Sequence, residues 1–115
     1  MEHDLQPGDF LIFQLEAGFA LLRLLAVDED NVWHVAAYSD FFPSVESAEE
    51  AITNGHLKVS EPHLALTQRA FDSTQVARIA NVLLEDDELA GLNVWGDDPD
   101  REVSDRSVRL MLGLR

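Results

Sequence analysis

The feature that most constrains the fold is an eleven-residue stretch, AGFALLRLLAV, from Ala17 to Val27, in which Arg23 is the one charged residue. A membrane-spanning helix needs about 20 apolar residues, so this stretch is expected inside a folded core and not in a bilayer. Leucine-rich runs form helices as well as strands, but turn-forming residues flank this one, Gly18 before it and Asp28-Glu29-Asp30-Asn31 after it. The stretch therefore predicts a central β-strand, Phe19 to Val27, that is covered on both faces.

Strands are also predicted on either side of this central one. Pro7-Gly8-Asp9 is a turn signal, and the segment that follows it, Phe10 to Glu16, is rich in residues that favour β-structure. Val32 to Ser39 has the same character. Three strands joined by short turns predict an antiparallel meander.

The pattern changes to a helical one after Phe41-Phe42-Pro43, where we expect one phenylalanine to stay exposed. Ser47-Ala48-Glu49-Glu50 has the spacing of a capping box, and Asn54-Gly55 supplies a left-handed stop. A short helix over residues 44–53 is predicted, with Val45, Ala48 and Ile52 facing the sheet.

The second half of the chain alternates short apolar segments with turn residues. Pro62 has no backbone N–H, so it marks an edge, a bulge or a turn. The segment from Thr74 to Leu84 fits strand and helix spacing almost equally well, and we expect a strand. The predicted elements are strands Leu57–Ser60, His63–Thr67, Thr74–Leu84 and Leu92–Trp95, a helical turn Glu85–Gly91, a loop Gly96–Asp100, and a terminal helix Asp105–Leu112 capped by Ser104.

The length of the chain suits a single hydrophobic core, and no linker or repeat divides it. We therefore expect one α+β domain over residues 1–115. Its sheet should be antiparallel and strongly bent or partly barrel-like, with one or two short helices packed against it.

The charge balance excludes several classes of function. Twenty-two acidic residues against eight basic ones give a net charge of −14, a field that repels phosphate backbones and argues against nucleic-acid binding. The absence of cysteine removes disulfides, thiolate metal sites and cysteine nucleophiles. Met1-Glu2-His3-Asp4 lacks the basic start of a secretory signal, so a cytoplasmic protein without a membrane span is expected.

The negative charge is concentrated near the end of the chain. Residues 85–105 contain nine acids and one base, Arg101, which together carry −8 of the −14. Carboxylates around an aromatic anchor predict binding to a basic protein, whereas a buried tryptophan among solvated acids would predict no function. The candidate partner-binding residues are Glu85, Asp86, Asp87, Glu88, Trp95, Asp97, Asp98 and Asp100.

The same acids invite comparison with a calcium-binding loop. Counting from Asp98, the alternation with Asp100 and Glu102 fits an EF-hand, but Val103 stands where glycine is required and no closing glutamate follows. A looser divalent site among Asp97, Asp98 and Asp100 is the less favoured alternative. We expect no metal and no other cofactor.

Arg23 is the most informative single charge, because an arginine inside an apolar strand must find a partner or reach the edge of the sheet. Asp9 and Asp40 are the expected partners. Alternatively, Arg23 holds an anion in a pocket with His34 and Tyr38, which would suit a small-ligand-binding domain or an enzyme. The four histidines have no metal-ligand or catalytic spacing, so no catalytic residue is assigned and a non-enzymatic protein is expected.

The beginning of the chain resembles the immunity protein 26 family of bacterial toxin loci. The resemblance covers residues 7–38 and rests on Pro7-Gly8-Asp9-Phe10, Gly18-Phe19-Ala20, the strand with Arg23 and the acidic turn after it. It implies neutralisation of a toxin by direct binding, without catalysis. The leading hypothesis is thus an acidic binding protein for a basic partner such as a nuclease-type toxin, and a structural module, including a homodimer, is a further alternative.

Overall fold

A computed structural model describes residues 5–16, 18–28, 31–71 and 75–107 of the chain. These residues form strands, two α-helices and two short 3-10 helices, labelled η. In chain order the elements are β1 (Asp9–Leu15), β2 (Gly18–Val27), β3 (Trp33–Phe42), α1 (Val45–Asn54), β4 (Val59–Leu66), η1 (Gln68–Phe71), β5 (Ala77–Asn81), η2 (Asp86–Leu89) and α2 (Ala90–Asp97).

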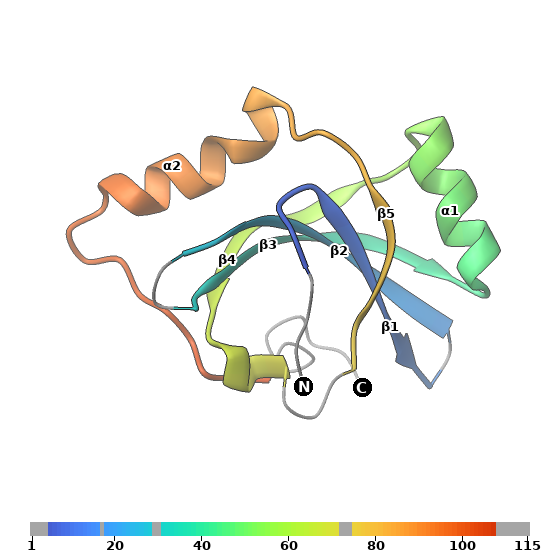
Figure 1. The fold of residues 1–115 in the computed structure, drawn as a ribbon, viewed down its shortest axis with the longest axis horizontal. Coiled ribbons are helices and arrows are strands. Elements are labelled where there is room, and N and C mark those ends of the chain that lie inside the picture. The colour runs from blue at the N-terminus through green and yellow to red at the C-terminus, as the bar shows by residue number, and fades with distance from the viewer. Residues whose placement is uncertain (1–4, 17, 29–30, 72–74, 108–115) are drawn as a thin grey trace.

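The strands form one antiparallel sheet in the order β4-β3-β2-β1-β5, and this confirms the predicted α+β class. The predicted meander is confirmed as β1, β2 and β3, with β3 extending to Phe42. The sheet is twisted but not closed into a barrel, because β4 and β5 form its two edges in the part of the chain that the structure describes (Figure 1).

The two edge strands differ in how well they were predicted. Two short strands were expected around Pro62, but β4 is continuous through it. An edge strand tolerates proline, and the pairing of β3 with β4 shifts between Val35 and Ala37, opposite this region. The strand expected within residues 74–84 is confirmed as β5, which returns to β1 and places Asp9 opposite Asn81.

An apolar core covers one face of the sheet, and η1 packs against this core. The rings of Trp33 on β3 and Phe71 on η1 lie with their centroids 4.6 Å apart. The buried members of this core are Leu11, Phe13, Ala20, Leu22, Leu24, Trp33, Val35, Ala37, Leu66, Ala70, Phe71 and Val76.

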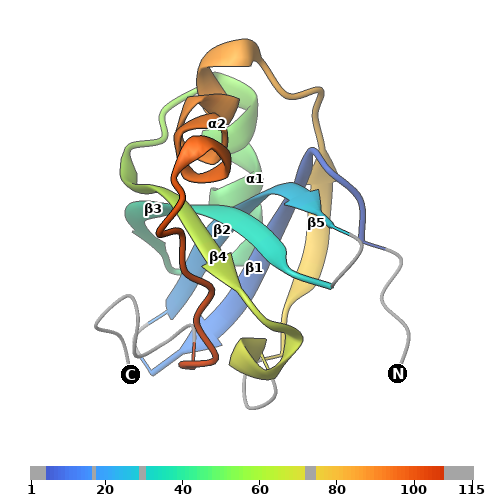
Figure 2. The same ribbon diagram turned by 90° about the vertical axis from the view of Figure 1, so that its left-hand side faces the viewer.

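Both α-helices lie over the opposite face, at its two ends (Figures 1 and 2). At one end α1 packs Ala48 and Ala51 into a cluster with Phe10, Ile12 and Leu21. At the other end η2 and α2 cover side chains of β2, β3 and β4. Because side chains alternate along a strand, every second residue of β2, β3 and β4 points to the helix-covered face, where the candidate sites described below lie.

The helix predicted over residues 44–53 is confirmed as α1, but its capping box differs from the expected one. Ser44, in an extended conformation after Pro43, is the N-cap, and its Oγ accepts a hydrogen bond from the Ser47 amide at 3.1 Å. The Ser47 Oγ in turn accepts a bond from the Ser44 amide at 3.2 Å, so the capping box begins at Ser44 and not at Ser47. The predicted stop is confirmed, since Gly55 is left-handed with φ 69°.

The strand predicted over Leu92–Trp95 is wrong, because these residues form the middle of α2. A four-residue apolar run is too short for its periodicity to separate strand from helix. Gly91, the predicted helix stop, lies instead in the first turn of α2, where it faces β4. Residues 105–107 are not helical, and the remainder of the predicted terminal helix lies outside the described residues.

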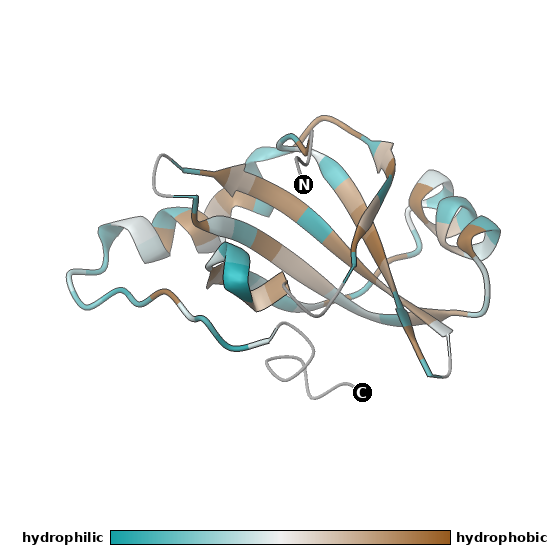
Figure 3. Cartoon of the chain, turned by 60° about the horizontal axis from the view of Figure 1, so that its bottom comes forward, coloured by the Kyte–Doolittle hydropathy of each residue, from teal (hydrophilic) through white to brown (hydrophobic). Residues whose placement is uncertain are grey.

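Hydropathy follows this architecture. Figure 3 shows hydrophobic residues along the strands and a mainly hydrophilic chain in the loop after α2. Within the described ranges, no helix combines the length and the apolar character needed to cross a membrane.

Candidate functional site

Arg23 lies on the helix-covered face of β2 and is 2% exposed. Its Nε donates to Glu88 Oε2 at 2.9 Å and its Nη2 to Glu88 Oε1 at 3.2 Å, so the guanidinium meets both oxygens of one carboxylate. The expected pairing of Arg23 with a carboxylate is confirmed, but the partner is Glu88 and not Asp9 or Asp40. Asp9 instead accepts hydrogen bonds from the Gln6 amide and the Asn81 side chain, and Asp40 accepts one from the Lys58 amide.

Two backbone carbonyls complete the surroundings of the guanidinium. Arg23 Nη1 donates to Gly8 O at 2.5 Å and Nη2 to Leu83 O at 3.3 Å. The guanidinium carbon also lies 4.2 Å from the centre of the Phe10 ring. Arg23 thereby joins the amino-terminal turn, β1 and η2, and each of its three guanidinium nitrogens donates at least one hydrogen bond within the protein.

Glu88 and Tyr38 lie beside Arg23 and have shifted pKa values. Burial acts to raise the pKa of Glu88, but hydrogen bonds from Arg23 and the Glu85 amide, together with the charge of Arg23, outweigh it and lower the pKa. Burial raises the pKa of Tyr38 to about 12, with Arg23 opposing the shift and Glu88 adding to it. At neutral pH Glu88 is therefore charged and Tyr38 carries its proton.

A second cluster joins β3, β4 and α2 through aromatic rings. His34, buried on β3, has Nδ1 2.9 Å from His63 Nε2 and Nε2 3.3 Å from Asp28 Oδ2. The two imidazoles stack with centroids 5.2 Å apart, and the Trp95 ring lies 4.8 Å from His34 and 5.7 Å from His63. Burial and the neighbouring His34 lower the pKa of His63 to about 4, so this imidazole is neutral at pH 7.

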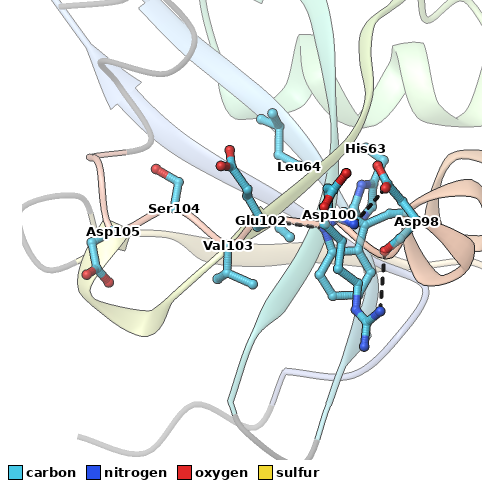
Figure 4. Close-up of a pocket in the computed structure, with 11 residues that line it drawn as sticks. His63, Leu64, Asp98, Asp100, Glu102, Val103, Ser104 and Asp105 are labelled. Carbon is cyan, nitrogen blue, oxygen red and sulfur yellow. Dashed lines mark hydrogen bonds between the residues drawn. The ribbon is translucent and has the colours of Figure 1, made fainter.

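A groove of about 750 Å³ runs between the outer edge of β4 and the segment after α2. Figure 4 shows His63, Asp98 and Asp100 grouped at one end of it and Asp105 at the other. The Trp95 Nε1 donates to Glu102 O at 2.8 Å, which anchors this segment, and Ser104 bridges to the backbone of β4. The lining residues are His63, Leu64, Ala65, Trp95, Asp98, Asp100, Arg101, Glu102, Val103, Ser104 and Asp105.

The residues predicted to bind a partner, the acids and Trp95, fall into three groups. Asp98, Asp100 and the half-buried Trp95 line the groove, with Asp97 exposed beside them. Glu88 is turned inward to Arg23. The third group, Glu85, Asp86 and Asp87, is exposed on the approach to η2 and on η2 itself.

A smaller cavity of about 140 Å³ lies between η2 and the strands β3 and β4. Its wall contains Tyr38 but neither Arg23 nor His34, so the structure does not bring the three residues of the alternative pocket into one cavity. The lining residues are Ala36, Tyr38, Val59, Pro62, Asp87 and Glu88.

Sequence reasoning missed His63, Arg101 and Glu102 as residues of the groove. His63 meets His34 across 29 positions of the chain, a distance at which spacing carries no signal. Arg101 lies with its guanidinium carbon 5.4 Å from the centre of the Trp95 ring. In the residues that the structure describes, no three histidine, aspartate or glutamate side chains are grouped to hold a metal ion.

Comparison with known proteins gives no relative from which a function could be transferred. No protein-family profile matches the chain, no curated protein matches it, and no solved structure matches its fold at the level of significance required.

Proposed function

We propose that this chain is a non-enzymatic binding protein whose groove beside α2 receives a basic segment of a partner protein. The observation that carries the proposal is the placement of Asp98, Asp100 and Glu102 around one groove that also contains the Trp95 ring. Carboxylates there would attract and orient cationic side chains, and the indole supplies apolar contact area.

The electrostatics of the groove support a cationic occupant. Arg101 is the one arginine or lysine among its lining residues, against four acids. His63 adds no positive charge at neutral pH, because its pKa is about 4. The groove is thus negative in a chain whose overall charge, −14, already attracts basic proteins over long range.

We further propose that the partner is a protein that binds nucleic acid. A protein that binds nucleic acid has a cationic surface, and a nuclease-type toxin covered at that surface would be neutralised without catalysis. The resemblance of residues 7–38 to the immunity protein 26 family motivates this choice of partner, and it stays a prediction.

Capture from a lysate of the source organism tests the proposal with matched variants. The tagged protein, its Asp100→Lys/Glu102→Lys variant and a control Glu49→Lys/Glu50→Lys variant are compared, with bound proteins eluted by increasing salt and identified by mass spectrometry. Glu49 and Glu50 are exposed on α1, so both variants change the net charge equally. We expect one basic protein on the unaltered and control proteins and its loss from the groove variant, whereas equal capture by both variants would contradict the proposal.

A further inference from the structure

The 140 Å³ cavity beneath η2 has an apolar side and a polar side. Ala36 on β3 and Val59 and Pro62 on β4 form the apolar side. These residues offer aliphatic contact to a ligand but no side-chain hydrogen bond. A ligand that fills the cavity must therefore present an unbranched or compact apolar portion to the sheet.

The polar side consists of Tyr38, Asp87 and Glu88. Both oxygens of Glu88 are bound to Arg23, which balances the charge of that carboxylate. Asp87 is exposed and has no ion-pair partner in the described part of the chain, so it leaves the cavity with a net negative charge. The Tyr38 hydroxyl, protonated at neutral pH, makes no hydrogen bond to any described residue and is available to accept one.

An aliphatic wall combined with an aromatic ring, a hydroxyl acceptor and a carboxylate matches a cation carried on an alkyl stem. An anion would face the unbalanced carboxylate of Asp87, and an apolar ligand would leave the polar side without a partner. We propose that this cavity binds an alkylammonium group, the chemistry shared by a lysine side chain and a free primary amine. The site is separate from the groove, and the inference holds whether or not the groove binds a protein.

The test uses three small probes followed by NMR chemical-shift changes of the backbone amides. Nα-acetyl-lysine N-methylamide presents a lysine side chain, n-butylammonium presents the free amine, and Nα-acetyl-norleucine N-methylamide has the same aliphatic stem without the charge. We expect saturable shifts around Tyr38, Val59 and Asp87 with the lysine probe, and binding of the norleucine probe weaker by about tenfold. Comparable binding of butylammonium would identify a site for free amines, and weaker binding would identify a site for lysine in a polypeptide.

Variants of the two neighbouring aspartates provide the matched control. Asp87→Asn should weaken binding of the lysine probe by about fivefold, because the substitution removes the unbalanced carboxylate of the cavity. Asp86→Asn, an equal change of charge on the same short helix outside the cavity lining, should leave the affinity nearly unchanged. Equal binding of the norleucine probe, equal effects of the two variants, shifts confined to the Trp95 groove, or no shifts at saturating probe would each overturn the proposal.

Discussion

The guanidinium of Arg23 and the carboxylate of Glu88 share two hydrogen bonds although 65 positions separate them in the chain. Arg23 is almost fully buried, whereas the Glu88 side chain is 27% exposed. The pair holds η2 against the sheet, and η2 leads directly into α2. The pair therefore supports the wall of the smaller cavity, which Asp87 and Glu88 of η2 help to form.

Removing the carboxylate should destabilise the fold. Glu88→Ala leaves the buried Arg23 charge without its partner, and we expect a loss of about 2–4 kcal/mol in the free energy of unfolding. Asp86→Ala, at an exposed position of the same short helix, should change it by less than about 0.5 kcal/mol. Urea denaturation of both variants measures the difference, and equal stabilities would show that Arg23 finds compensation elsewhere.

Mild acid should weaken the fold through His63. The groups that face it are His34 on β3, Trp95 on α2 and, through His34, Asp28. Its pKa of about 4 lies below the unfolded value of 6.5, so the unfolded chain binds the proton more readily and stability falls as the pH drops from 6.5 toward 4. One pKa unit is worth about 1.4 kcal/mol, and partial exposure of the ring reduces the whole effect to about 1–2 kcal/mol.

The His63→Gln variant separates this effect from general acid denaturation. A glutamine side chain can still hydrogen-bond to His34 but does not titrate, so the variant's stability should fall less than that of the unaltered protein between pH 6.5 and 4. If the stabilities of the two proteins, measured by urea denaturation, fall in parallel with pH, His63 is not the origin of the loss of stability in mild acid.

The two glycines of α2 should respond in opposite directions to alanine. A Cβ at Gly91 would lie 2.9 Å from the His63 Cβ and 3.4 Å from Pro62 O, whereas one at Gly96 meets nothing within 4 Å. Gly96→Ala should therefore stabilise the protein by about 0.5–1 kcal/mol through helix propensity. Gly91→Ala should lose that gain and destabilise, with a change in the fluorescence of Trp95, while stabilisation by both substitutions would show that α2 shifts freely on β4.

Once a partner is captured, the salt dependence of its affinity should report on the groove. Asp100→Lys/Glu102→Lys should weaken binding and flatten the decrease of affinity with rising salt, because attractive charge pairs are lost. Glu49→Lys/Glu50→Lys changes the net charge equally and should alter the slope less. Isothermal titration at several salt concentrations measures both, and identical slopes would place the interface away from the groove.

Much of the sheet could be predicted because its signals are local. Apolar runs between turn residues define β1, β2 and β3, and Gly55 marks the end of α1 through its left-handed conformation. The register and the strand order β4-β3-β2-β1-β5 could not be predicted, since the return of β5 to β1 depends on packing between distant segments.

The candidate site was predicted only in its composition. The sequence indicates that Trp95 stands among carboxylates, and the structure places Asp98 and Asp100 with it in one groove. That Glu88 is used internally, and that His63 contacts Trp95, follows from contacts across the fold that no spacing rule encodes. The sequence shows how many carboxylates surround Trp95, but it does not show which of them are used inside the fold and which line the groove.

The strand order also determines which parts of the molecule open together. Strands β1, β2 and β3 each pair with the next strand in the chain, whereas β5 pairs with β1 at the opposite edge of the sheet from β4, and η2 and α2 follow it in the chain. Local pairings form early, and contacts that close a long loop form late, so the segment from β5 to α2 should dock last during folding. In native-state hydrogen exchange this segment should behave as its own cooperative unit, which exchanges before the meander does.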